Sequence, residues 1–252
     1  MNYTTPLDET ILACVDCEST GLDTQSDRVL EVAVILFRGN SVLEEFQTLI
    51  NPQRDIPETS YAIHKISSEM VAESPTIETV LPTVFKLLGN HPIIGHGIDF
   101  DLELLTQEAK RSNIPCNIQN NTRVDTVRLG RLYGESPSNS LEMLRSHFNI
   151  AEEGAHRAMS DVLVNVKVFQ HLTQKYKTLN QVLEVLSKPI LMKTMPLGKY
   201  RGRLFKDLPL DYIQWAMRQK FDQDLLFSLK LEFNRRKKGG LFTQVTNPFQ
   251  SL

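Results

Sequence analysis

Three short runs rich in Val, Ile and Leu open the chain, and they constrain its fold more than any other feature. The runs are Ile11–Asp16, Val29–Phe37 and Val42–Ile50, and turn-forming stretches separate them. Short runs of this composition predict β-strands, and the first two are apolar enough to be buried on both faces. The chain is therefore expected to begin with three consecutive strands.

Helical spacing dominates the chain beyond residue 75. One more strand is predicted at Pro92–Gly95, and elsewhere apolar residues recur every three or four positions. The predicted helices are Thr76–Leu88, Phe100–Arg111, Val124–Leu132, Leu141–Phe148 and Met159–Tyr176. Strands first, then strand and helix in alternation, predict an α/β fold with a mixed β-sheet flanked by helices.

The net charge of −2 hides an asymmetry along the chain. Residues 1–187 carry 15 Lys and Arg against 25 Asp and Glu, whereas residues 188–252 carry 13 against 5. Lys188-Pro189 marks the boundary, because helices tend to end before proline. We therefore expect an acidic body at 1–187, a small basic module at 188–240 and a flexible tail at 241–252. A basic segment joined to an acidic body is typical of chains that handle polyanions.

The compartment is indicated by what the sequence lacks. No apolar run approaches the roughly 18 residues that a membrane span needs, which predicts no membrane partner. The start of the chain has neither the basic nor the apolar part of a secretory signal. Cys14, Cys17 and Cys116 lack metal-ligand spacing. A reducing cytoplasm is the expected location, and an organelle or nucleus stays open.

Four carboxylates stand where strands end or helices begin. Asp16 and Glu18 end the first strand and, being two residues apart, point to the same face. Asp101 and Asp161 fall in the first turns of two predicted helices, where acidic residues also serve simply to stabilise the helix. His156 lies five residues before Asp161.

The combination is more informative than any one of these residues. If the four carboxylates converge on one sheet edge, each pair at about 4 Å costs roughly 4 kcal/mol at an effective dielectric of about 20. Divalent cations with oxygen ligands relieve that repulsion, and two such ions suit phosphoryl displacement. A histidine nearby suits the role of general base.

Three segments resemble, in order, the motifs of the DEDDh 3′→5′ exonuclease superfamily. They are Asp16–Gly21, His96–Asp101 and His156–Asp161. Ala62–Ile66 is similar to that family's loop beside the 3′-terminal nucleotide, and Asp125, Thr126 and Leu129 also fit. The resemblance covers roughly residues 10–175 and implies a ribonuclease H-like mixed sheet.

The resemblance implies a role for each matching residue. Asp16, Glu18 and Asp161 would ligate the first of two divalent metal ions, expected to be Mg²⁺ with Mn²⁺ as a substitute. Asp16, helped through water by Asp101, would hold the second ion, and His156 would take the proton from the attacking water. Expected substrate contacts within the body are Thr20, Gly21, Ile63, His64 and Phe100.

Two positions depart from the superfamily's pattern. Cys17 stands where the family usually has Thr, and Gly97 where it usually has Asn. Cys17 is expected to point away from the carboxylate face, because side chains alternate along a strand. Loss of the Asn amide bears on substrate preference and leaves the chemistry unchanged.

The basic module is expected to contain an extended hairpin at Met195–Phe205 and helices at Asp211–Gln219 and Asp222–Arg236. In an extended hairpin Lys199, Arg201 and Arg203 would share a face, with Tyr200 on the other, and bind phosphates. Tyr200, Phe205 and Trp215 are candidate base-stacking surfaces, although filling a small core is the favoured interpretation of the module's aromatic residues, including Tyr212. The segment also resembles the C-terminal module of a deoxyribonuclease in the same superfamily.

The sequence therefore predicts a metal-dependent 3′→5′ exodeoxyribonuclease that releases nucleoside monophosphates. Its expected partner is the 3′ end of single-stranded or frayed duplex DNA, in repair or proofreading, with a replication or repair protein as a further candidate. An RNA 3′ exonuclease of the same superfamily is one alternative. A catalytically inactive exonuclease-fold binding subunit is another, disfavoured because all five catalytic positions are present.

Overall fold

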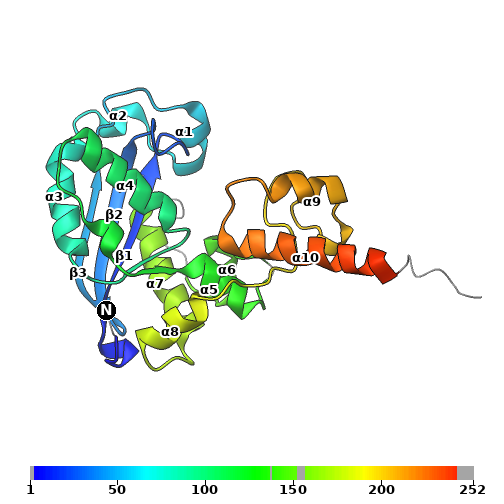
Figure 1. The fold of residues 1–252 in the computed structure, drawn as a ribbon. Helices are drawn as coiled ribbons and strands as arrows, with labels where there is room; N and C mark the ends of the chain where they lie inside the picture. The colour runs from blue at the N-terminus through cyan, green and yellow to red at the C-terminus, as the bar shows by residue number, and fades with distance from the viewer. Residues whose placement is uncertain (1–2, 137, 152–156, 243–252) are drawn as a thin grey trace, which may run out of the picture. The chain divides into compact units, whose positions relative to one another are not determined.

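The computed structural model describes residues 3–136, 138–151 and 157–242. The chain forms two compact units, the first running to Val185 and the second beginning at Leu186 (Figure 1). Within the described residues, no helix combines the length and the apolar character needed to cross a membrane.

The first unit is built on a five-stranded mixed sheet in the order β3-β2-β1-β4-β5. The first three strands are antiparallel neighbours, and the last two run parallel to β1. The strands are β1 (Ile11–Ser19), β2 (Val29–Arg38), β3 (Ser41–Leu49), β4 (Ile93–Gly95) and β5 (Arg123–Asp125). The predicted α/β fold with a mixed sheet flanked by helices is confirmed.

Helices cover both faces of this sheet. They are α1 (Glu58–His64), α2 (Ser68–Val71), α3 (Ile77–Leu88), α4 (Asp99–Arg111), α5 (Thr126–Tyr133), α6 (Leu141–His147), α7 (Ala158–Thr173) and α8 (Leu179–Leu186). Figure 1 shows α3 and α4 on one side of the strands and α7 on the other. Helices α1, α2 and α8 are not among the predicted elements.

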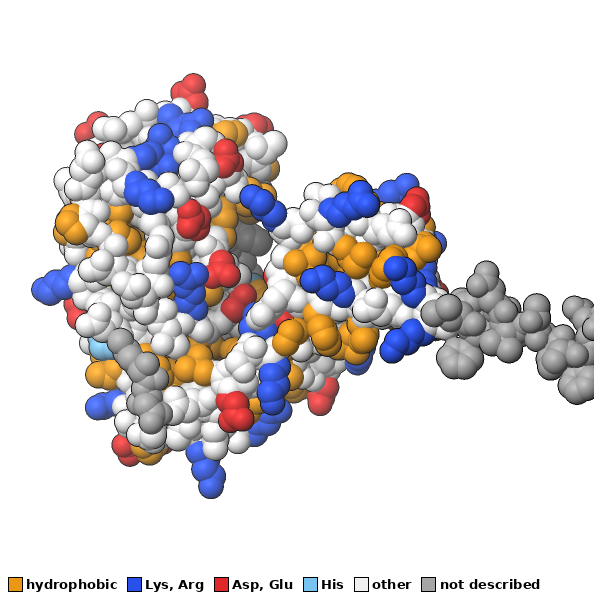
Figure 2. Space-filling view, viewed as in Figure 1, with side chains coloured by type: hydrophobic (Ala, Val, Ile, Leu, Met, Phe, Trp, Pro, Cys, Tyr) orange, Lys and Arg blue, Asp and Glu red, His pale blue; other side chains and the backbone are white. Residues whose placement is uncertain are grey.

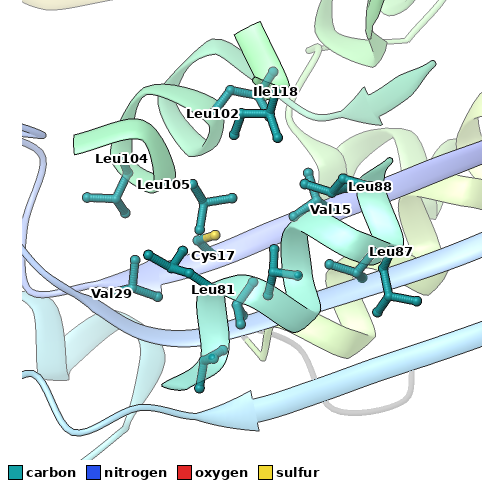
Figure 3. Packing of buried hydrophobic residues seen from close by; sticks show 14 of the residues in the cluster. Val15, Cys17, Val29, Leu81, Leu87, Leu88, Leu102, Leu104, Leu105 and Ile118 are labelled. Carbon is teal, nitrogen blue, oxygen red and sulfur yellow. The ribbon is translucent and has the colours of Figure 1, made fainter. Parts of the chain in front are cut away.

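Alternation along β1 sorts its side chains between the two helical layers. Val15 and Cys17 belong to the core that α3 and α4 complete, where Cys17 lies close to Leu81 and Leu105 and Val15 close to Leu88 (Figure 3). Cys14 faces the opposite way, and its sulfur lies 3.9 Å from the Val162 carbonyl oxygen of α7. The expectation that Cys17 points away from the carboxylate face is confirmed, and residues 16 and 18 project on the α7 side.

One predicted element of the first unit needs correction. The helix predicted at Val124–Leu132 starts two residues later, at Thr126, because Val124 and Asp125 belong to β5. The Asp125 carboxylate accepts the Val127 amide proton at 2.8 Å, which caps the helix at that point. The third predicted strand is confirmed as β3, an edge strand on which Val42 and Leu43 remain 49% and 45% exposed.

The C-terminal unit has a small core of its own. Helices α9 (Leu210–Ala216) and α10 (Gln223–Phe242) pack around buried side chains. The core comprises Met195, Phe205, Leu208, Ile213, Ala216, Leu225 and Leu229. Burial of Phe205 agrees with the core-filling interpretation. Trp215 contradicts it, since its side chain is 51% exposed.

The predicted extended hairpin at Met195–Phe205 is wrong. One antiparallel bridge joins Thr194 to Leu204, and a 3₁₀ turn at Gly198–Tyr200 occupies the middle of the segment. Gly198 and Gly202 adopt φ angles of +71° and +82°, which glycine tolerates without strain. The turn breaks the strand alternation, so the predicted division of cations and Tyr200 between two faces does not occur.

Candidate active site

The first and third sequence motifs meet near the C-terminal end of the central strand β1. Asp16 and Glu18 project from β1 toward α7, and Asp161 lies in the first turn of that helix. One carboxylate oxygen from each residue lies within 4.8 Å of the other two. Oxygens bound to a single Mg²⁺ at about 2.1 Å are at most about 4.2 Å apart. Small side-chain movements would therefore bring all three onto one divalent ion, and oxygen-only donors suit Mg²⁺ or Mn²⁺.

Asp101 joins this cluster through the backbone. Its side chain is 4% exposed, and Oδ1 accepts the Cys17 amide proton at 3.0 Å. Helix α4 thus presents a carboxylate to the strand between Asp16 and Glu18. Asp101 lies outside the group of three whose ligand atoms converge, a position that suits a ligand acting through water.

Burial and mutual repulsion disfavour ionisation of these carboxyl groups. Burial raises the pKa of Glu18 to about 7, and the Asp161 and Glu31 carboxylates add to the rise. Burial also raises the pKa of Asp101 to about 8, although the Cys17 amide opposes the change. The pKa of Asp16 lies well above its usual value, chiefly because of burial and secondarily because of repulsion from Asp101 and Asp161. A cation bound among them would reverse these shifts.

An unpredicted ion pair sits beside the cluster. Glu31 on β2 has no exposed surface, and the Arg157 guanidinium donates to it at 2.7 Å and 3.0 Å. The Ala158 amide donates to the same carboxylate at 3.2 Å, and the Gln47 amide at 2.6 Å. Burial alone would raise the pKa of Glu31, but these hydrogen bonds hold it below its usual value.

This pair fastens the start of α7 to the sheet. Arg157 and Ala158 begin the helix that carries Asp161, and Glu31 is the cross-strand partner of Glu18. The Glu31 carboxylate therefore determines where α7 begins relative to β1. One sequence signal could have revealed it, since Glu31 is the single charge inside the apolar run Val29–Phe37.

The second motif is tied to β5 and α5. Asp125 Oδ1 accepts the Gly97 amide proton at 3.0 Å, and His96 Nδ1 lies 3.0 Å from the Thr126 hydroxyl. Burial lowers the pKa of His96 to about 4, so this imidazole is neutral near pH 7. Gly97 has φ +77°, a region that Gly and Asn favour over other residues.

The expected substrate contacts differ in their exposure. Ile63 is 61% exposed, whereas His64 is 2% exposed and accepts the Ile66 amide proton at Nδ1. Thr20 is also buried, with its hydroxyl donating to Asp27 at 2.8 Å. Neither the His64 ring nor the Thr20 hydroxyl is therefore at the surface of this structure.

Three other residues of the body were expected at the site. Gly21 leaves no space for a Cβ, which would collide with the Asp27 carboxylate. Phe100 is partly buried against the main core. His156, the expected base, lies outside the described residues.

Comparison with known proteins identifies the first unit. A family model described as "Exonuclease" matches residues 13–169. The chain belongs to this exonuclease family. A second model, described as "Putative quorum-sensing-regulated virulence factor", matches residues 183–233.

Curated relatives agree with the exonuclease assignment. A DNA polymerase III subunit epsilon-like protein of Rhodobacter capsulatus is 35% identical over 179 residues, covering 69% of this chain and 25% of that protein. The DNA polymerase III subunit epsilon of Aquifex aeolicus is 28% identical over 62% of this chain and 76% of its own length. The chain thus spans about a quarter of the first relative and most of the second.

A solved structure shares the exonuclease fold. Exonuclease X in complex with 5′-overhanging duplex DNA superposes with a TM-score of 0.52 at 23% identity, covering 66% of this chain and 92% of that one. The resemblance to DEDDh-type exonucleases inferred from the motifs is confirmed by these matches.

The raised pKa values generate a prediction about stability without metal. Groups such as Glu18 and Asp101 keep protons in the folded state that the unfolded chain releases above about pH 4. The free energy of unfolding of the metal-free protein should therefore fall as the pH rises from about 5 to 8. Asp101→Asn should flatten this slope, and saturating Mn²⁺ should oppose the loss in the unmodified protein.

Urea unfolding in EDTA, followed by far-UV circular dichroism at several pH values, measures the slope. Asp99→Asn is the matched control, since Asp99 lies two residues earlier on α4 and its side chain is 82% exposed. An Asp101→Asn slope equal to that of the unmodified protein would contradict the electrostatic explanation.

The ion pair between Glu31 and Arg157 leads to a second prediction. Glu31→Gln removes the charge that holds Arg157, and should lower the free energy of unfolding by about 1.5–3 kcal/mol, as for hydrogen bonds to charged groups. It should also weaken Mn²⁺ binding measured by calorimetry, because the start of α7 loses its attachment. Glu142→Gln is the control, because the Glu142 carboxylate that pairs with Arg145 is 60% exposed, and it should cost less than about 1 kcal/mol. Equal effects of the two variants would show that Glu31 does not position the cluster.

Proposed function

We propose that this chain is a metal-dependent 3′→5′ exodeoxyribonuclease that releases nucleoside monophosphates from DNA 3′ ends, in repair or proofreading. The observation that carries the proposal is the convergence of Asp16, Glu18 and Asp161 within 4.8 Å in a member of an exonuclease family. Three partly buried carboxyl groups this close together repel one another unless cations bind there, so their presence favours a role in catalysis.

Each carboxylate has a proposed place at the reacting phosphate. Asp16, Glu18 and Asp161 would hold one divalent ion, and Asp16 with Asp101 through water would hold the second. When bound, two such ions supply positive charge for the attacking and leaving oxygens of the phosphodiester. In the proposed reaction the water oxygen attacks phosphorus, its proton passes to His156 and the bond to the 3′ oxygen breaks.

Exposure suggests which residues would contact the substrate. The exposed side chain of Ile63 on α1 would contact the terminal nucleotide. The backbone at Thr20 and Gly21, directly after β1, and the partly buried Phe100, at the start of α4, would lie close to the same nucleotide. His64 would support this loop from inside, because its ring accepts the Ile66 amide proton. DNA as substrate is supported by the relatives, which are named as DNA polymerase III subunits or solved with DNA.

The cations of the C-terminal unit would hold the strand beyond the reacting end. Lys199, Arg201 and Arg203 are all exposed, and the unit's basic balance contrasts with the acidic body. Contacts of this kind to phosphates are independent of sequence and weaken as salt rises.

The decisive experiment is digestion of 5′-labelled and 3′-labelled DNA, single-stranded and duplex, and of RNA, with Mg²⁺, Mn²⁺ or EDTA. A ladder of shortening 5′-labelled products, with mononucleotide released at once from 3′-labelled DNA, is expected only with metal. Faster digestion of RNA would favour an RNA 3′ exonuclease. No digestion of any substrate would favour an inactive binding subunit.

Substitution of the carboxylates tests the site itself. Asp16→Ala, Glu18→Ala, Asp101→Ala and Asp161→Ala should each abolish digestion, because transition-state charge stabilisation is lost. Metal-free stability should stay equal or increase in the Asp16, Glu18 and Asp161 variants, because each of these changes relieves repulsion. Asp99→Ala, at an exposed position of α4, should retain activity. Turnover like that of the unmodified enzyme in the Asp16 or Asp161 variant would rule out this site.

Replacing His156, the proposed base, should affect the enzyme differently from replacing a carboxylate. His156→Ala should slow hydrolysis by roughly 10²–10⁴-fold, the usual range for loss of a general base. Binding of Mn²⁺, measured by calorimetry, should be unchanged. The pH–rate profile should also lose the limb that belongs to the base. A small loss of rate with an unchanged profile would assign His156 a structural role.

Neutralising the three cations of the C-terminal unit tests whether they bind DNA phosphates. Replacing Lys199, Arg201 and Arg203 together by Gln should weaken binding of long DNA and flatten its salt dependence. Each lost phosphate contact should reduce the slope of log K against log salt by about 0.7 for a single strand or about 0.9 for duplex. Cleavage of a very short oligonucleotide should hardly change. Replacing Lys167, Lys175 and Lys177 of the first unit by Gln is the charge-matched control, and equal slopes for both triple variants would contradict the proposal.

A further inference from the structure

Three aromatic rings form a row on the C-terminal unit. The Tyr200 and Tyr212 ring centroids lie 4.6 Å apart in an edge-to-face arrangement. The Tyr212 and Trp215 centroids lie 5.4 Å apart with the planes tilted by 37°. Tyr200 and Tyr212 pack against the unit's core, so the row rests on a fixed base and ends in an exposed indole.

The local structure explains why Trp215 faces outward. Ile213 and Ala216 are the residues of α9 that enter the core. Tyr212 and Trp215, three positions apart, lie side by side on an adjoining strip of the helix. The core of this small unit is complete without Trp215. A large aromatic side chain that remains half-exposed in this way is typical of binding surfaces.

Cations flank the row. Lys199 Nζ and Arg203 Cζ each lie 5.4 Å from the centre of the Tyr200 ring. Both are exposed, and neither pairs with a carboxylate among the residues that the structure describes. A separate groove of about 600 Å³ on the same unit is lined by Arg218 and Lys230, among others. Figure 2 shows hydrophobic side chains alternating with lysine and arginine side chains on this unit.

We propose that Trp215, at the end of this aromatic row, stacks on an unpaired base of single-stranded nucleic acid whose phosphates contact Lys199 and Arg203. Stacking on an exposed ring tolerates every base, and neighbouring cations bind the backbone. Bases inside a duplex already stack on each other, so the site selects unpaired strand. This inference rests on the proposed function for its substrate class and adds a site that discriminates strand type.

The chain offers a direct probe of this site. It has a single tryptophan, so intrinsic fluorescence reports on Trp215 alone. The full-length protein in EDTA, which prevents metal-dependent cleavage, is titrated with an oligothymidine of about 15 nucleotides, near the upper site size of single-strand binding folds, and with a blunt duplex of the same length. Saturable quenching by the single strand and little quenching by the duplex are expected.

Binding of a fluorescein-labelled oligothymidine, measured by anisotropy, gives the affinity of variants. Trp215→Ala should weaken it by roughly 5- to 150-fold, the effect of one lost stacking contact, and Trp215→Phe should weaken it less. Leu210→Ala, on the same helix and 45% exposed, is the control and should bind normally. Circular dichroism melting checks that each variant is folded.

The possible outcomes separate this inference from the proposed function. Unchanged fluorescence and an unchanged Trp215→Ala affinity, in a protein that digests DNA 3′ ends, would overturn the stacking site alone. Equal quenching by duplex and single strand would overturn the selectivity for unpaired bases. A protein that neither binds nor digests nucleic acid would overturn both.

Discussion

Repulsion among partly buried carboxylates is the constraint on which the rest of the first unit depends. Asp16, Glu18 and Asp161 come from two elements, and their oxygens lie within 4.8 Å of one another beside Asp101. Like charges at such distances cost several kcal/mol unless protons or cations neutralise them. Elements that carry them must therefore be held in place by other interactions. The main core under α3 and α4 and the packing of α7 on β1 and β2 provide that hold.

Charge is balanced locally around this cluster. Glu31 lies across the strand from Glu18 and would add to the repulsion, yet it accepts hydrogen bonds from Arg157, Ala158 and Gln47. The pair therefore attaches α7 to the sheet while leaving the neighbouring carboxylates able to accept a cation. Asp101 also has two roles, because its hydrogen bond to the Cys17 amide links α4 to β1 at the point where the carboxylates project.

The proposed function assigns the two units different physical tasks. An acidic site needs divalent cations to approach a polyanion, and it exerts little long-range attraction of its own. The C-terminal unit carries 13 basic and 5 acidic residues from 188 to 252, and its aromatic row ends in an exposed Trp215. Steering of nucleic acid by such a surface depends on net charge and salt, whereas hydrolysis depends on geometry at the ångström level. The exonuclease match ends at residue 169, and a different family model covers residues 183–233.

The sequence by itself determined four of the five strands, the main helices and the carboxylates of the site, because strand alternation and helical periodicity are local properties of the chain. Asp16, Glu18 and Asp161 could be placed together from motif order and strand-end positions.

Tertiary structure alone decided what depends on distant partners. The role of Glu31 requires Arg157, 126 positions away. Burial of His64 and Thr20 results from packing that no local pattern displays. The 3₁₀ turn at Gly198–Tyr200 replaced the predicted hairpin because two glycines with positive φ allowed the chain to fold back tightly. Trp215 stayed outside because the seven-residue core, which takes Ile213 and Ala216 from α9, was already filled.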